Sequence, residues 1–141
     1  MVRNITPPRT PAILFPIALI LLLLHAVLGA DYLIQRFQLE VSGWPDLMRH
    51  LPLDELWLRV IWALSVWLGV AASFFLLLRD NASVLLFFAA TVAGLALASG
   101  LYTAQAPGLP VPLTVLLAAM VIVPAFGWIY ARALNRRDVL H

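Results

Sequence analysis

A stretch of chain without formal charge, between Asp80 and Arg132, constrains the fold most strongly. A helix needs about 20 mostly apolar residues to cross a bilayer, so this stretch is too long for one crossing. Its apolar sequence is interrupted once, by the proline- and glycine-rich segment 105–112. The pattern predicts two membrane-spanning helices joined by a tight turn.

The first half of the chain repeats this pattern, with apolar runs at residues 10–30 and 60–78. The apolar fraction is 63% and the mean hydropathy is +0.96, and both values exceed those of soluble proteins. We therefore expect an all-α integral membrane four-helix bundle that forms one domain over residues 1–141. Its spans are expected at about residues 10–35, 56–78, 82–104 and 112–133.

The residue types that the chain lacks exclude several kinds of chemistry. It contains no cysteine and no lysine, and its nine basic residues are all arginines. Disulfides, thiolate metal sites, Schiff bases and lysine-dependent phosphate loops are therefore excluded. A nucleic-acid partner is not expected, because the arginines are spread over loops and tails. The first apolar run exceeds a typical signal-peptide core, so we expect it to remain as a membrane anchor.

The distribution of arginine predicts the orientation, since cytoplasmic loops are enriched in basic residues. With both termini in the cytoplasm, the outer side holds three arginines and the inner side holds six. The loop 37–55 then lies on the outer face of the membrane, where its amphipathic sequence predicts an interfacial position with a short helix at 45–50. The inner set is Arg3, Arg9, Arg79, Arg132, Arg136 and Arg137.

His25 is the most suggestive polar residue, because ionisable groups within a span usually face the bundle or a cavity. One alternative is an axial ligand for haem or chlorophyll, although the sequence places no second histidine on a facing span. Another is a proton relay to Asp31 or a hydrogen bond in a pocket. The third is a neutral imidazole bonded to a backbone carbonyl or to a serine of a neighbouring helix.

Asp31 and Arg59 lie at the outer ends of the first and second predicted spans. A carboxylate that is partly removed from water needs a partner, and Arg59 is the first candidate, with Arg36 the second. Such a pair is either a gate at the mouth of a cavity or a clamp between two helix ends. Tyr32 shares a helix face with His25, so the four residues predict a small polar pocket or ion pair. Hydroxyl-bearing residues of the third span are candidates for the same pocket: Thr91, Ser99, Tyr102 and Thr103.

Small residues recur at every fourth position in the second and third predicted spans. In lipid, such residues let helices approach closely and associate. Because a three-residue turn joins these spans, we expect the two stripes to form the contact between them, and the alternative is a dimer interface. The stripes are Ser65, Gly69 and Ser73 in the second span and Ala90, Gly94 and Ala98 in the third.

Enzyme signatures are missing from the sequence. It has no glycine-rich phosphate loop, no paired-histidine metalloprotease motif and no serine elbow. The neighbouring carboxylates Asp46, Asp54 and Glu55 lie in the outer loop and indicate solvated charge. We therefore expect a protein without enzymatic activity and without a cofactor or metal.

Several segments together suggest a family. Residues 24–32 read LHAVLGADY, residues 61–69 read IWALSVWLG and residues 76–79 read LLLR, with Tyr-Thr at 102–103 and Tyr-Ala-Arg at 130–132. These segments resemble a widespread group of small four-helix bacterial inner-membrane proteins of uncharacterised function, which often carry the label "sugar transporter". Gly29, Asp31 and Tyr32 match the group, which often has Trp-Asn where this chain has His25-Ala26. The resemblance implies a bacterial inner-membrane location.

Two functions are the main hypotheses at this point. The first is an accessory or assembly subunit of a larger respiratory or photosynthetic membrane complex, because the chain is small and its outer loop suits a docking role. The second is a transporter of a small, sugar-like solute, which requires a homo-oligomer because four spans do not easily enclose a path. The third hypothesis is a membrane enzyme or redox carrier, for which the sequence offers no pair of cofactor ligands. The expected partners are the lipid bilayer and either another protein or further copies of this chain.

Overall fold

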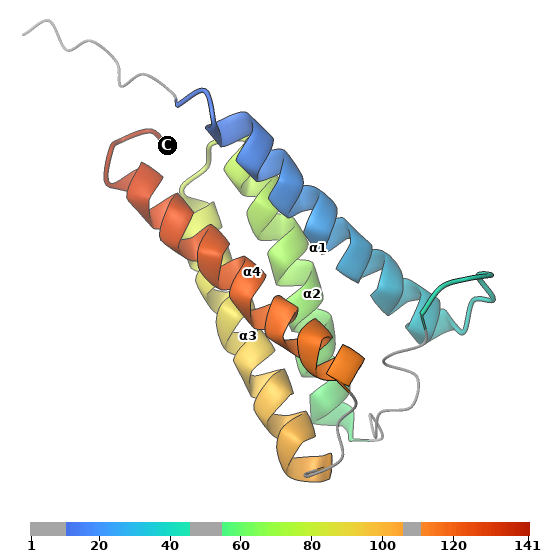
Figure 1. Cartoon of the computed structure of the whole chain (residues 1–141). Helices are drawn as coiled ribbons and strands as arrows, with labels where there is room; N and C mark the ends of the chain where they lie inside the picture. The colour runs from blue at the N-terminus through green and yellow to red at the C-terminus, as the bar shows by residue number, and fades with distance from the viewer. Residues whose placement is uncertain (1–10, 46–54, 106–110) are drawn as a thin grey trace, which may run out of the picture.

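Four long helices make up the computed structural model, which describes residues 11–45, 55–105 and 111–141 (Figure 1). Each helix is long and apolar enough to cross a membrane. The four predicted spans are therefore confirmed as helices, and the chain is an all-α protein with four candidate membrane-spanning helices. In chain order they are α1 (Leu14–Phe37), α2 (Leu56–Leu77), α3 (Ala82–Gln105) and α4 (Val111–Asn135).

The helix ends differ from the predicted ones by a few residues, for local reasons. α1 begins at Leu14 rather than at residue 10, because Pro11 closes a turn in which the Leu14 N–H donates to its carbonyl over 3.0 Å. The helix ends where Gln38 adopts a left-handed conformation with a φ of 52°. Most of the expected short helix at 45–50 lies outside the described residues.

The helices pack largely in chain order. α2 packs on α3 and α3 on α4, while α1 lies along α2 and makes little other contact. Figure 1 shows α1 on one side of α2, with α3 and α4 on the other side. α1 and α4 therefore form the two flanks of the arrangement, and each keeps a wide apolar face toward its surroundings.

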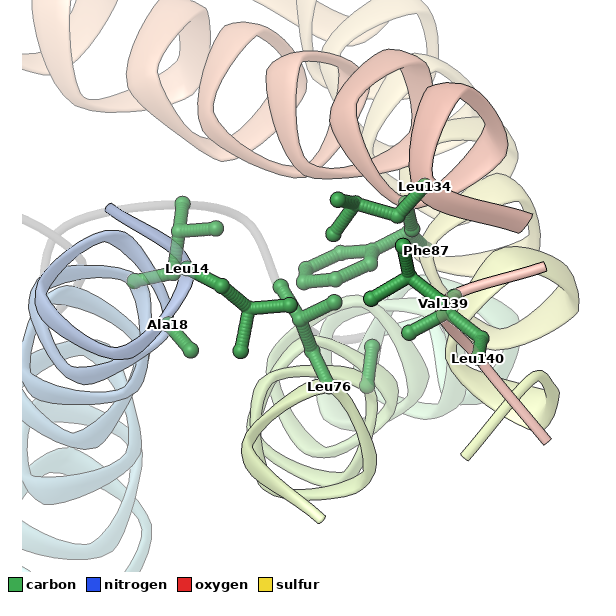
Figure 2. Packing of buried hydrophobic residues seen from close by; sticks show 10 residues of the cluster. Leu14, Ala18, Leu76, Phe87, Leu134, Val139 and Leu140 are labelled. Carbon is green, nitrogen blue, oxygen red and sulfur yellow. The ribbon is translucent and has the colours of Figure 1, made fainter. Parts of the chain in front are cut away.

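Two apolar clusters fill the space between the helices. The Phe87 cluster lies where α1 and α3 begin and α2 and α4 end, and Figure 2 shows the Phe87 ring between side chains of α2 and α4. Its members are Leu14, Ala18, Leu21, Ala72, Leu76, Phe87, Ala131, Leu134, Val139 and Leu140. The Trp62 cluster lies toward the opposite end and consists of Leu58, Trp62, Val66, Leu97, Leu101, Leu113, Leu117 and Met120.

The segment after α4 returns to the turn between α2 and α3. Val139 and Leu140 are buried in the Phe87 cluster. The His141 N–H donates to the carbonyl oxygen of Arg79 over 2.9 Å, and the Asn81 N–H donates to the carbonyl oxygen of His141 over 3.0 Å. The Arg79 guanidinium also donates to the carbonyl oxygen of Val139 over 3.2 Å. This segment and the turn therefore hold each other in place.

Glycines allow α3 and α4 to come into close contact. A Cβ at Gly94 would lie 2.6 Å from the carbonyl oxygen of Met120, and one at Gly127 would lie 2.5 Å from the Phe87 ring. A Cβ at Gly29 would instead meet its neighbours at 3.7 Å or more, which is ordinary contact. The close approach of the helices therefore requires glycine at positions 94 and 127 but not at 29.

We predict that Gly94→Ala destabilises the protein by about 1–3 kcal/mol, because its methyl group meets a backbone atom of α4. Gly29→Ala is the matched control. We expect no loss of stability from this control, since the helix propensity of alanine is more favourable than that of glycine by about 1 kcal/mol. Thermal unfolding of both variants in one detergent measures the difference, and equal stability would contradict the close contact of α3 with α4.

Candidate functional site

His25 lies inside the protein, between the two apolar clusters. Its side chain is 1% exposed. It follows Leu21 of the Phe87 cluster by one helical turn, and it packs on Gly69, which lies between the Trp62 cluster and Ala72 on α2. An ionisable residue buried within a candidate membrane-spanning helix is a candidate functional site.

The hydrogen bonds of His25 join α1 to α2. Its Nδ1 lies 2.8 Å from the carbonyl oxygen of Leu21 and 3.0 Å from Oγ of Ser73. Since a carbonyl oxygen only accepts, Nδ1–H is the donor, and the Ser73 hydroxyl donates onward to the carbonyl oxygen of Gly69 over 2.8 Å. These partners agree with the third alternative for His25, a neutral imidazole bonded to a backbone carbonyl or to a serine of a neighbouring helix.

The other ring nitrogen, Nε2, is buried and has no hydrogen-bond partner in the part of the chain that the structure describes. It lies against Gly69, where an added Cβ would approach it to 2.6 Å and the ring carbon Cδ2 still more closely. The Phe87 ring of α3 lies on another side, with 6.0 Å between the ring centroids. Nε2 therefore presents an acceptor lone pair to apolar surroundings, and only glycine at position 69 leaves room for the imidazole.

Asp31 bonds to the segment that follows α1. The indole Nε1 of Trp44 donates to its carboxylate over 2.8 Å, and the two residues are thirteen positions apart. The sequence predicts an interfacial position for the loop 37–55, which contains Trp44, but its pattern does not identify Trp44 as the partner of Asp31. Arg59 lies exposed near the start of α2, and its pairing with Asp31 stays a prediction. His25 bonds to Leu21 and Ser73 while Asp31 bonds to Trp44, so these hydrogen bonds do not connect His25 to Asp31.

Tyr32 packs against aromatic side chains of α2. Its ring centroid lies 4.9 Å from that of Trp62 and 6.1 Å from that of Trp67, both in edge-on geometry. Tyr32 and His25 thus both face α2, as the spacing of seven residues predicts. The tyrosine contributes to helix packing, while His25 Nδ1 and the Asp31 carboxylate bond to other residues.

Gly69, Ser73 and Gly94 do not face one another across α2 and α3, which corrects the expectation for these three residues. Gly69 and Ser73 face His25 of α1, whereas Gly94 faces Met120 of α4. α2 and α3 are still neighbours, and one of their contacts is Gly100 against Trp57. The remaining members also lie inside the helix packing: Ser65 bonds to the Trp62 carbonyl of its own helix, Ala90 is fully buried and Ala98 packs on the Trp62 cluster.

The hydroxyl groups of α3 do not converge on a pocket with His25. Thr91 donates to the carbonyl oxygen of Phe87 over 2.8 Å, Thr103 donates to that of Gly100 over 2.9 Å, and Ser99 bonds to Leu95. Each of these bonds stays within α3. Tyr102 is 62% exposed. The serine and threonine hydroxyls that were expected to line a pocket therefore donate to backbone carbonyls of their own helix, which is common for these residues in helices.

The geometry around His25 suits a structural contact between α1 and α2, in which Nε2 remains an acceptor without a partner among the described residues. Among the described residues, no group of three or more histidine and carboxylate side chains lies close enough to hold a metal ion. Comparisons with protein-family models, with curated proteins and with solved structures gave no match to this chain. The resemblance to small four-helix inner-membrane proteins therefore stays a prediction.

We predict that Gly69→Ala destabilises the protein by about 1–3 kcal/mol, because its methyl group collides with the His25 ring. In a His25→Ala background the same change should cost little, since the ring that it meets is gone. Thermal unfolding of the two single variants, the double variant and the unaltered protein in one detergent completes the cycle. If the destabilisation of the double variant equals the sum of the two single variants, the contact is contradicted, because residues in contact show a coupling free energy in such a cycle.

Proposed function

We propose that this chain is a non-enzymatic accessory or assembly subunit of a larger complex in a bacterial inner membrane, with a respiratory or photosynthetic complex as its host. The observation that carries the proposal is the exposure of α1. This helix packs chiefly on α2, and its opposite face carries large apolar side chains. They are Phe15, Leu19, Ile20, Leu23, Leu24 and Val27, all between 38% and 61% exposed.

A helix that is attached mainly through one neighbour is well suited to bind a second protein. Association in lipid depends on side-chain packing and hydrogen bonds, so an unoccupied flank is a surface that a partner helix can use. The hydrogen bond between His25 and Ser73 fixes the rotation of α1 relative to α2. The same apolar face of α1 is therefore always presented outward.

The interior of the protein supports this proposal over transport by a single chain. The Phe87 cluster and the Trp62 cluster fill the space toward each end with buried apolar side chains. Between them, His25 Nδ1 and the Ser73 hydroxyl are already bonded. A solute path would therefore need additional copies of the chain, whereas a role in assembly needs only the outward faces.

A photo-crosslinking residue in place of Leu23 tests the proposal in native membranes. We expect a discrete adduct with a subunit of a large complex, because Leu23 is 59% exposed on the outward face of α1. The matched control is the same residue in place of Leu21, which is 3% exposed and should give no intermolecular adduct. Mild-detergent extraction, a native gel and mass spectrometry of the adduct identify the partner.

The outcomes separate the accessory role from its alternatives. An adduct between two copies of this chain would favour a homo-oligomer. A protein that runs alone on the native gel and gives no adduct at position 23 would contradict the accessory role.

Transport of a small, sugar-like solute by a homo-oligomer is the second candidate function. The observation that favours it is the buried Nε2 of His25, an acceptor without a partner among the described residues. Polar groups within a span often mark substrate or ion pathways. Solute uptake by reconstituted vesicles that is lost in Asp31→Asn or His25→Ala and unchanged in Ser65→Ala would support it.

We further propose that both termini lie in the cytoplasm, which rests on the excess of arginine at that end of the helices. Because the chain has no cysteine, single cysteines report on each side without a background. We expect a membrane-impermeant maleimide to label Ser42→Cys in intact spheroplasts and Asn81→Cys only after lysis. Both positions are exposed. The reverse pattern would show the opposite orientation.

A further inference from the structure

We propose that the C-terminal end of α4 carries a binding site for the headgroup of an anionic phospholipid. The site goes beyond the proposed function, and it rests on the orientation proposed above but not on the accessory role. It is a hollow on the protein surface with a volume of about 430 Å³. The hollow is lined by Trp128, Ile129, Arg132, Ala133, Arg136 and Arg137.

The hollow follows from the periodicity of the helix. Residues four positions apart lie one above the other on a helix, so the lining residues form two adjacent rows. The Arg136 N–H donates to the Arg132 carbonyl over 3.1 Å, which extends the helical geometry to the last turn. Each row runs from an apolar side chain to an arginine, and the small Ala133 leaves space between them. The rows are Trp128, Arg132 and Arg136, and Ile129, Ala133 and Arg137.

The charge of the hollow fits a phosphodiester. Three of its six lining residues are arginines and none is acidic. A guanidinium donates two parallel hydrogen bonds to a phosphate, which makes arginine the side chain best suited to this group. The Arg132 guanidinium carbon lies 5.6 Å from the centroid of the Trp128 ring, and this cation–π contact holds the guanidinium beside the hollow.

The position of the hollow along α4 favours a lipid over a soluble phosphate. The uncharged part of the helix ends at Arg132, so the hollow lies where the helix leaves the hydrocarbon region, a level at which tryptophan is enriched. Next to it, the same face of α4 exposes Ile122, Phe126 and Ile129, which are 65%, 53% and 63% exposed. A phospholipid would cover both surfaces, with its phosphate at the arginines and its acyl chains along the apolar face.

The side of the membrane agrees with this assignment. The arginine distribution predicts that the end of α4 is cytoplasmic, and the cytoplasmic leaflet carries the anionic lipids. Arginine in the last turn also stabilises the helix dipole, but that role needs no hollow. The joint presence of three arginines, an interfacial tryptophan and an adjacent apolar face indicates a site for a whole lipid.

Native mass spectrometry of the detergent-purified full chain tests the proposal. The protein is titrated with phosphatidylglycerol or with phosphatidylcholine of the same acyl chains. We expect phosphatidylglycerol to bind more tightly, and we expect Arg132→Gln/Arg136→Gln to weaken its binding by about fivefold for each arginine removed. Ala133→Phe should weaken it as well, because the ring fills the hollow while all three charges remain.

The matched control is Arg36→Gln/Arg59→Gln, which removes the same charge at the opposite end of the helices and should leave lipid binding unchanged. Thermal unfolding confirms that each variant is folded. Equal loss in both double variants, or equal binding of the two lipids, would overturn the site. Displacement of phosphatidylglycerol by millimolar inorganic phosphate would overturn the lipid as its ligand and assign the hollow to a soluble phosphate.

Discussion

Helices in a bilayer are not driven together by the hydrophobic effect, because lipid chains are as apolar as leucine side chains. The attachment of α1 therefore depends on a specific fit, which the His25 imidazole makes against Gly69 of α2. Ser73, one turn further along α2, adds a hydrogen bond to the same ring. The fit fixes both the distance between the two helices and the face that α1 turns outward.

The same principle extends across the rest of the protein. The His25 ring contacts the Phe87 ring of α3, and the Phe87 ring packs against Gly127 of α4. Two rings and two glycines, one residue from each helix, thus form a continuous line through all four helices. The two apolar clusters and the outward positions of the apolar flanks follow from this alignment.

Hydropathy alone was enough to predict the spans, because a run of some 20 apolar residues has few other possible structures. The face that each helix turns toward its neighbours could not be predicted in the same way, since the spans are apolar on all sides and no polar face marks the interior. The spacing of Ser65, Gly69 and Ser73 indicates a contact, and the short turn favours α3 as its partner, whereas Gly69 and Ser73 contact His25 of α1. The partner of Asp31 was missed for a related reason: Trp44 lies in a segment without a periodic pattern, so spacing does not reveal its contact.

The docking of Val139 and Leu140 in the Phe87 cluster has a consequence for biogenesis. A chain enters the membrane from its N-terminus during synthesis, and each span can insert before the next one is made. The Phe87 cluster, which lies where α1 begins and α2 ends, nevertheless lacks members until residue 140 has left the ribosome. Final packing of this end of the first two helices therefore follows the synthesis of residue 140.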